Sequence, residues 1–264
     1  MSLIVTVCTS EGIILASDSR SSLTKTVPLE NKEIIQFGAH YSDTAYKTFL
    51  CSNNIGISTC GNANVMGKSI ASHIENFINN CICKNDSVKE VSEKLLTYFS
   101  GLHHSDPVVF HVAGYEKTNG RDCSKVYRVV TNLNVNSLVL DDSCGVQWDG
   151  ESEVLRRIIK NGYVVGESDV IALNNLTITN SEGIPTTLEN VIVLPNNALH
   201  SKEAEIAWEY MTIQDGIDFA KYAIQTTIDT MRFQVAAKTV GGPVDILVVK
   251  PDKTIWIAHK ELHY

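Results

Sequence analysis

Several features that would direct the interpretation of a sequence are absent from this one. No run of apolar residues approaches the length of about 18–20 that a membrane-spanning helix needs, so we expect no membrane segment. The amino terminus has no basic stretch followed by an apolar one, so we expect no signal peptide. Acidic residues outnumber basic ones by 30 to 22, and the net charge of −8 argues against a nucleic-acid partner, because phosphate binding requires a positive face. These absences favour a cytoplasmic protein.

Residues with the spacing of a metal site are also missing. The seven cysteines are scattered and odd in number, and they form no CxxC pair and no cluster with histidine. Cys81 and Cys83 lie too close together for the usual zinc site, and His103 and His104 show no ligand spacing. We therefore expect no metal, no cofactor, and thiols that stay reduced.

What the sequence does contain is the composition of an ordinary globular protein. Its 264 residues are 44% hydrophobic and 20% charged, which allows a sizeable core. No internal repeat, low-complexity tract or clear linker interrupts the chain. The sequence therefore predicts a single domain over residues 1–264, in which residues 161–205 are the least readable stretch and a candidate insertion.

Two β-hairpins are predicted near the start of the chain. Short β-branched, apolar runs at residues 3–8 and 12–18 flank one turn, and the runs at 46–51 and 55–59 flank another. Residues 21–44 between the two hairpins are mostly polar, and we interpret them as a long excursion.

Helical periodicity follows these strands. Apolar residues at spacings of three and four predict a helix over about 62–82. A second helix is expected to begin at Ser87, because Ser87 and Glu90 match the capping-box pattern. A third helix is predicted to open near Gly150, and a long fourth one spans about 212–233. Further strands are predicted near 108–115, 125–131, 137–140, 244–249 and 254–258.

The order of these elements indicates the fold class. Runs of strands alternate with runs of helices, whereas strict alternation of single strands and helices would predict a parallel sheet. The sequence therefore predicts an α+β fold in which helices are layered outside antiparallel sheets.

Four residues with catalytic potential lie beside the predicted strands. Ser2 follows Met1, and Asp18 closes the second strand, 16 positions further on. Lys47 opens a later strand, and Gly61 follows it by 14 positions. A serine hydroxyl is a weak nucleophile unless a base takes its proton. The simpler interpretation is that Asp18 and Lys47 are strand-end charges and that Gly61 belongs to a turn.

In residue types and in both spacings, this set resembles the proteasome β-subunit family, and most closely its bacterial ancestral-β-subunit branch. The sequence Val240-Gly241-Gly242-Pro243 resembles the glycine turn after the family's long helix. The stretch between Asp18 and Lys47 is longer than in typical members. The resemblance implies the amino-terminal nucleophile (Ntn) hydrolase fold, a four-layer α-β-β-α sandwich with two antiparallel sheets.

The resemblance also implies a role for each residue. After removal of Met1, the Ser2 hydroxyl is the nucleophile, and the α-amine of Ser2, with a reference pKa of about 8, is its base. The Lys47 ammonium lowers the pKa of that amine, and Asp18 holds the lysine in place. The N–H group of Gly61 faces the developing oxyanion.

Asp149 is the fifth candidate site residue. By position it resembles the family's serine that supports the terminal amine, and it equally fits an N-cap or first-turn carboxylate of the helix expected near Gly150. The family's supporting aspartate and serine fall on Ala237 and Val240, whose side chains cannot hydrogen-bond. The amine therefore has fewer partners here than in typical members.

The resemblance also locates a specificity pocket. Its positions correspond to small side chains, so we expect a roomy pocket and name no preferred substrate side chain. Cys60, next to Gly61, is interpreted as a small packing residue. The pocket positions are Ser21, Ala45, Thr59, Ala63 and Gly67.

By resemblance, the function is that of a proteasome-like, threonine/serine-type peptidase, which hydrolyses peptides or unfolded proteins through an acyl-enzyme. The resemblance implies a homo-oligomer, as a ring or a spiral, and admits an AAA+ unfoldase as partner, although no docking motif is visible. Two alternatives stay open. One is an Ntn amidase acting on a small-molecule amide. The other is a non-catalytic, ring-forming scaffold subunit, which the residues at Ala237 and Val240 favour.

Overall fold

The structure is a computed structural model that describes most of the chain. The described residues are 2–29, 32–102, 107–160, 178–179, 185–186, 206–235 and 237–261. The chain divides into one compact unit of Met1–Ser152 with Ala207–Tyr264 and a second of Glu153–Ile206, and the single domain over 1–264 stays a prediction. Met1, His103, His104 and nearly all of 161–205 lie outside the described residues.

The first sheet of the larger unit contains the amino-terminal strand at an inner position. It has five antiparallel strands in the order β12-β1-β2-β15-β16, so chain segments from both ends of the sequence lie side by side. Their bounds are Leu3–Thr9 (β1), Gly12–Ser17 (β2), Gly145–Gly150 (β12), Asp245–Val249 (β15) and Thr254–Ala258 (β16).

The second sheet is also five-stranded and antiparallel, in the order β11-β10-β9-β6-β5. Its central strand β9 pairs with β6 on one side and with β10 on the other. Its strands are Thr48–Leu50 (β5), Gly56–Gly61 (β6), Val108–Thr118 (β9), Arg121–Val130 (β10) and Val135–Asp141 (β11).

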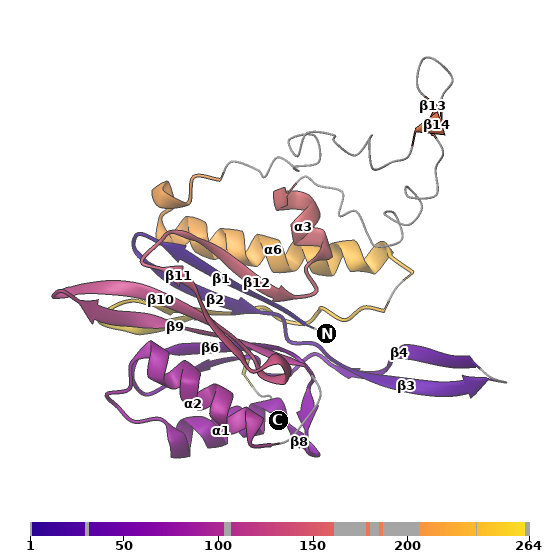
Figure 1. Cartoon of the computed structure of the whole chain (residues 1–264), viewed down its shortest axis with the longest axis horizontal. Helices are drawn as coiled ribbons and strands as arrows, with labels where there is room; N and C mark the ends of the chain where they lie inside the picture. Colours follow the sequence, from indigo (N-terminus) through magenta and orange to yellow (C-terminus); the bar gives the residue numbers. More distant parts are fainter. Residues whose placement is uncertain are drawn as a thin grey trace. The chain divides into compact units, whose positions relative to one another are not determined.

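Helices cover the outer face of each sheet within this unit (Figure 1). Helix α6, Ile213–Phe233, packs on β1 and β2 of the first sheet. Helices α1, Ile70–Cys81, and α2, Val88–Ser100, lie on the other side, where α2 packs on β9 and β10. The two sheets face each other in between, so the unit is the predicted α+β, four-layer sandwich.

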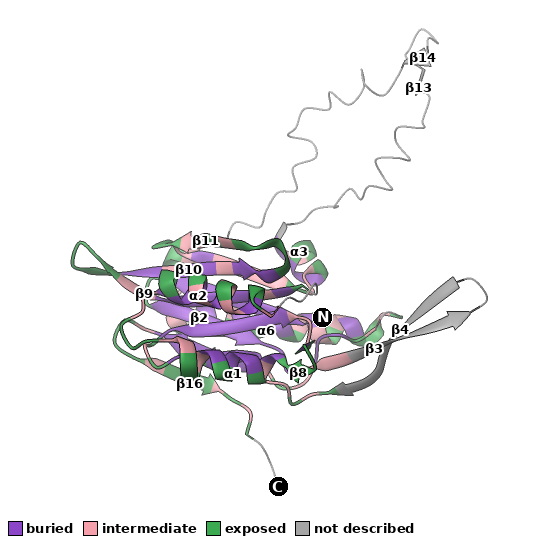
Figure 2. Cartoon of the chain, turned by 60° about the horizontal axis from the view of Figure 1, so that its bottom comes forward, coloured by how far each residue is buried: buried purple, intermediate pink, exposed green. Residues whose placement is uncertain are grey.

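The core lies in and around the two sheets, as the buried central strands in Figure 2 show. Every residue of β1 and β2 is buried, because the facing sheet covers one side of these strands and α6 covers the other. This explains why their sequences read as almost continuous apolar runs, with burial of each large side chain contributing roughly 1.5–3 kcal/mol. A second cluster joins Ile57 and Phe110 of the second sheet to Phe77 and Phe99 of α1 and α2.

The predicted starts of two helices are confirmed, one of them from its capping-box signal. Ser87 and Glu90 form the expected capping box of α2. Thr212 and Asp215 form another at the start of α6, the predicted long helix. None of the described helices combines the length and the apolar composition that a transmembrane span requires.

Three segments differ from the sequence-based prediction. Residues 21–42 of the polar excursion form a hairpin of β3, Ser21–Leu29, and β4, Lys32–Ser42. The helix expected from residue 62 begins only at Ile70, after the short strands β7, Asn64–Val65, and β8, Lys68–Ser69. Val65 matches the helical spacing because it is buried in the same core cluster as Ile70, although its backbone is extended.

The third difference concerns the segment before residue 150. Strand β12 was not predicted, since its sequence Gly-Val-Gln-Trp-Asp-Gly lacks a clean alternation. The helix expected near Gly150 is α3, Glu153–Lys160, in the second unit. The remaining described elements are Thr131–Leu133 (η1), Ile178–Thr179 (β13), Pro185–Thr186 (β14) and Trp208–Tyr210 (η3).

Candidate active site

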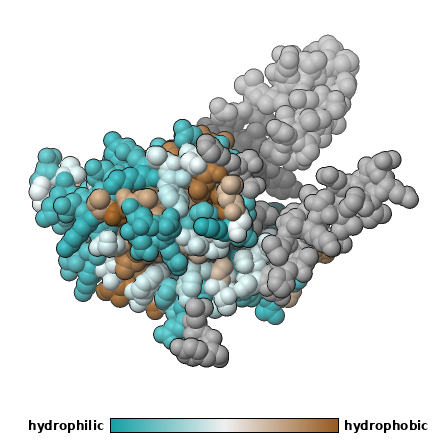
Figure 3. Space-filling view, turned by 90° about the horizontal axis from the view of Figure 1, so that it is seen from below, coloured by the Kyte–Doolittle hydropathy of each residue, from teal (hydrophilic) through white to brown (hydrophobic). Residues whose placement is uncertain are grey.

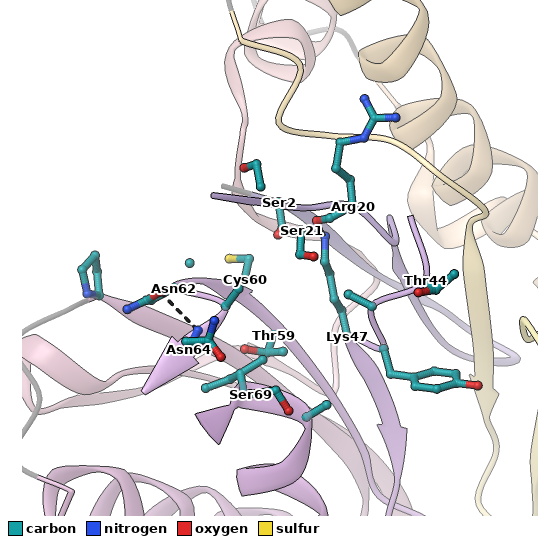
Figure 4. Close-up of a pocket in the computed structure, with 18 residues that line it drawn as sticks. Ser2, Arg20, Ser21, Thr44, Lys47, Thr59, Cys60, Asn62, Asn64 and Ser69 are labelled. Carbon is teal, nitrogen blue, oxygen red and sulfur yellow. Dashed lines mark hydrogen bonds between the residues drawn. The ribbon is translucent and has the colours of Figure 1, made fainter. Parts of the chain in front are cut away.

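A cavity of about 520 Å³ opens at the amino-terminal end of β1 (Figure 4). Six separate chain segments supply its walls, and three of the predicted catalytic residues, Ser2, Lys47 and Gly61, are among its lining residues. The lining comprises Ser2, Pro107 and residues 20–22, 44–47, 59–64 and 69–71.

Ser2 is held at the cavity by the strand that follows it and by the end of β12. It is 6% exposed, and its carbonyl oxygen accepts a hydrogen bond of 2.8 Å from the N–H of Glu151. Gly150, the last residue of β12, has φ +98°, and a Cβ there would lie 1.8 Å from the Ser2 carbonyl oxygen. A glycine is therefore required for this close approach.

Asp18 follows β2 and is fully buried. Its Oδ1 accepts hydrogen bonds from Leu3 N at 3.0 Å and from Lys47 Nζ at 2.8 Å. Its Oδ2 accepts from Arg20 N at 3.1 Å and from Gly241 N at 3.0 Å. Four donors thus satisfy a carboxylate that water does not reach, and they tie the start of β1 to the glycine turn before β15.

Lys47 precedes β5, and its side chain runs from there toward Ser2 and Ser21 (Figure 4). It is 5% exposed and donates to Asp18 and, at 2.5 Å, to the carbonyl oxygen of Arg20. Burial lowers the pKa of Lys47 below its usual value, and the charge of Asp18 and its hydrogen bond raise it again in part. The ammonium is therefore a buried charge whose one close carboxylate is Asp18 among the ion pairs of the described residues.

The second cation of the cavity wall is also paired. Arg20 donates from Nε and Nη2 to the two carboxylate oxygens of Asp43, at 2.7 and 2.8 Å. This bidentate hydrogen bonding lowers the pKa of Asp43. Both positive charges of the lining thus have their own carboxylate.

Gly61 ends β6 beside the cavity. It has φ +108°, and a Cβ at this position would lie 2.3 Å from the carbonyl oxygen of Pro107, so only glycine fits without displacement. Its neighbour Cys60 is buried, as expected for a packing residue. Burial raises the pKa of the Cys60 thiol far above its usual value, which keeps the thiol protonated and a poor nucleophile.

Asp149 lies in β12, paired with Ile4 of β1, so the interpretation as an N-cap or first-turn carboxylate is wrong. Its carboxylate accepts hydrogen bonds from His111 Nε2 at 2.9 Å and, in a bidentate manner, from Arg128 at 2.6 and 2.7 Å. Burial alone would raise the pKa of Asp149, but these hydrogen bonds and charges hold it well below its usual range. Among the described residues, Asp149 is not part of the cavity lining.

The partners of Asp149 were not among the predicted site residues. His111 of β9 and Arg128 of β10 stand opposite each other in register, and Thr6 of β1 lies 2.8 Å from His111 Nδ1 through its hydroxyl. Thr6 and His111 are fully buried, so this polar network bridges the two sheets. The sequence signal for it is a histidine within the apolar run Val-Val-Phe-His-Val-Ala, where a buried polar residue requires partners.

Four of the five positions expected in the specificity pocket line the cavity, namely Ser21, Ala45, Thr59 and Ala63. Gly67 does not; it lies in the turn between β7 and β8, where an added Cβ would meet nothing within 4 Å. At position 240, where the resemblance would place a supporting serine, the structure has a buried apolar side chain, that of Val240.

The two facing antiparallel sheets and the helix layers outside them form the Ntn-hydrolase fold. A solved structure with this fold is the Anbu (Gly-1) mutant from Hyphomicrobium sp. strain MC1. It matches with a TM-score of 0.52 and 11% sequence identity, over 98% of this chain and 88% of that one. No protein-family model and no curated protein sequence matches the chain. At this level of identity, the likeness shows the fold.

Proposed function

We propose that this chain is a proteasome-like peptidase of the bacterial ancestral-β-subunit branch, with Ser2 as its nucleophile after removal of Met1. The observation that carries the proposal is the buried Asp18–Lys47 pair, whose lysine lines the same cavity as Ser2 in an Ntn-hydrolase fold. A buried ion pair adds little net stability, so its position at a cavity beside a serine favours a role in chemistry.

In the proposed reaction, the Ser2 hydroxyl oxygen attacks the carbonyl carbon of a peptide bond, and its proton passes to the α-amine of Ser2. The resulting oxyanion accepts a hydrogen bond from the Gly61 N–H, an interaction often worth about 3–4 kcal/mol. The oxyanion then collapses, the C–N bond breaks, and the leaving amine takes the proton from the α-ammonium. Water hydrolyses the remaining ester by the same steps and restores the Ser2 hydroxyl.

Lys47 serves this reaction as a fixed positive charge. An ammonium near the α-amine disfavours a second positive charge there, which lowers the pKa of the amine and makes it a free base near neutral pH. Asp18 keeps the lysine charged and in place despite its burial. Asp149 is a positioning residue in this proposal, because it anchors β12, whose end holds Ser2, to His111 and Arg128 of the other sheet.

The proposed setting is an oligomer in the cytoplasm. The ring or spiral encloses the sites, and its substrates are peptides or unfolded proteins. An AAA+ unfoldase is a further partner that this class of assembly admits. The match to Anbu supports the assembly only through the shared fold.

Replacement of the nucleophile tests the proposal. We expect Ser2→Ala to abolish hydrolysis of fluorogenic peptides while the sedimentation profile stays that of the unchanged protein. The matched control is Ser10→Ala, at an exposed position in the turn between β1 and β2, which leaves both measurements as they were. Undiminished hydrolysis by an assembled Ser2→Ala protein contradicts the proposal.

The scaffold alternative rests on one observation. Neither Ala237 nor Val240 offers a side-chain hydrogen bond to a terminal amine. Chains isolated from the native host that retain Met1 would support the scaffold, since no free amine then adjoins Ser2. A stable monomer that hydrolyses a small amide would instead favour the amidase.

A further inference from the structure

A second buried ion pair lies close to Lys47, at the carboxyl-terminal side of the first sheet. Asp245, the first residue of β15, is fully buried and accepts a hydrogen bond of 3.0 Å from the backbone N–H of Lys260. The Lys260 ammonium also pairs with the carboxylate of Asp245. A buried carboxylate bonded twice by one residue fixes the chain segment after β16 against the start of β15.

His259 and Lys260 of this segment also contact Tyr46, the residue before Lys47. The Lys260 ammonium lies 4.6 Å from the centroid of the Tyr46 ring, within the range of a cation–π interaction. The Tyr46 hydroxyl donates to the Lys260 carbonyl oxygen at 3.3 Å, and the ring lies 5.3 Å from that of His259. Tyr46 itself lines the cavity, so the segment supports the cavity wall from behind.

The same ion pair is joined to the strand that carries Asp18. Asp245 stands opposite Ser17 of β2, the residue before Asp18. The hydroxyl of Ser17 accepts a hydrogen bond of 2.8 Å from the hydroxyl of Thr48, the residue after Lys47. The Asp245–Lys260 pair is therefore connected to the residues next to Asp18 and Lys47, through strand pairing with Ser17 and through the contacts of Tyr46.

We propose that the Asp245–Lys260 ion pair is a positioning element of the active site, which holds Tyr46 and the adjacent Lys47 in place and sets a second cation near the catalytic one. The inference rests on the proposed function. The charged and titratable groups that act on Lys47 are Asp18, Asp43, Cys60 and Lys260. Those around Lys260 are Asp245, Tyr46 and His259. In the proposed function the free α-amine of Ser2 is a further titratable group near Lys47. The charge of Lys260 lowers the pKa of Lys47.

The test compares Lys260→Met, Lys260→Arg and the double variant Asp245→Asn/Lys260→Met in the full chain. Peptide hydrolysis is measured as a function of pH, and the Lys47 side chain is titrated by NMR with ¹³C-labelled lysine. Loss of the Lys260 cation moves the pH profile and the Lys47 titration to higher pH. We also expect kcat/KM at pH 7 to fall roughly 10-fold, because small displacements at a reacting site reduce rates by such factors.

The controls separate positioning from general stability. Lys260→Arg keeps the cation and retains the original profile. Lys94→Met removes the lysine of another ion pair, with Asp86 on the α2 side of the molecule, and leaves the profile unmoved. The double variant leaves no unpaired buried charge, so it reports on Lys47 even where Lys260→Met fails to fold.

Unchanged pH profiles and an unchanged Lys47 titration in both Met-containing variants overturn the inference. An unmodified protein without peptidase activity contradicts the proposed function instead. The NMR titration then still decides whether Lys260 acts on Lys47, so the two failures are distinguishable.

Discussion

At the scale of single residues, Asp18 connects the parts of the candidate site. Its carboxylate is fully buried and accepts from three backbone N–H groups and from Lys47. Because the Asp18 carboxylate is shielded from solvent, its charge is stabilised by these four donors, and solvent cannot replace a donor that is lost. Stability and the proposed chemistry therefore depend on the same ion pair.

We predict that Asp18→Asn lowers the free energy of unfolding by about 3–5 kcal/mol, since it leaves the Lys47 ammonium buried without a counter-charge. Urea denaturation at pH 7 measures this loss. The control is Asp43→Asn, in a pair whose carboxylate is 37% exposed, where we expect about 1 kcal/mol or less. Equal losses in the two variants would contradict the interpretation of Lys47 as a buried charge.

The lowered pKa of Asp149 predicts that the stability of the fold depends on pH. Its pKa in the folded protein lies well below the unfolded value of about 3.9, so its ionised form stabilises the fold above that pH. This contribution is lost as the pH falls below about 4 toward the folded pKa. The difference in unfolding free energy between the unchanged protein and Asp149→Asn should therefore shrink in acid. Asp252→Asn, at an exposed turn, is the control, and its difference stays small and constant.

The sequence predicted the location of some site residues but not the surroundings of others. The family resemblance implied that Ser2, Asp18, Lys47 and Gly61 lie together, and Lys47 and Gly61 do line the cavity with Ser2. The environment of Asp149 was not predictable, because His111 and Arg128 reach it from two strands of the other sheet. The histidine within an apolar run signals that His111 needs a buried partner, but nothing local to it identifies Asp149 as that partner.

At the scale of elements, the end of β12 decides how Ser2 is held. Gly150 brings the strand end against the Ser2 carbonyl oxygen, and Glu151 then donates to that oxygen. A side chain at position 150 has no room there.

We therefore predict that Gly150→Ala displaces the end of β12 and disturbs Ser2, with a loss of both stability and hydrolysis. Gly120→Ala is the matched control, because Gly120 also has a positive φ, +80°, but a Cβ there meets nothing within 4 Å. Strain at a positive φ costs about 1–2 kcal/mol in both variants. The excess loss in Gly150→Ala, measured by thermal unfolding, reports the contact with Ser2, and equal losses would contradict it.

Helices and strands were predicted correctly where the local sequence specifies them. A capping box marked the start of α2, and continuous apolar runs marked β1 and β2. Strand β12 was missed because it is an edge strand of mixed, mostly half-buried residues without a clean alternation. The start of α1 was misplaced because core burial imitates helical periodicity.

At the scale of the whole molecule, the larger unit has the layers that the element order predicted. Strand order within each sheet was not predictable from the sequence, since it joins segments such as β2 and β15 that are over 200 residues apart. Figure 3 shows the face seen from below with apolar patches separated by hydrophilic surface. Large apolar side chains are also exposed at the end of α6, at Phe233 and Val235.

The proposed assembly predicts a sedimentation velocity profile of the untagged chain dominated by species of several copies at micromolar concentration. Dilution should release smaller species by mass action. A profile that remains monomeric over the whole concentration range would contradict the assembly and favour the amidase interpretation.

The central claim is that Ser2 becomes an amino-terminal nucleophile, and intact-protein mass spectrometry tests it most directly. The untagged chain is measured before and after treatment with an epoxyketone-type inhibitor, which reacts with a hydroxyl and a free amine on the same residue. We predict a mass without Met1 and one inhibitor adduct per chain, mapped to Ser2. A retained Met1 and no adduct would contradict the claim, and the hydrolase proposal would fall while the fold remained.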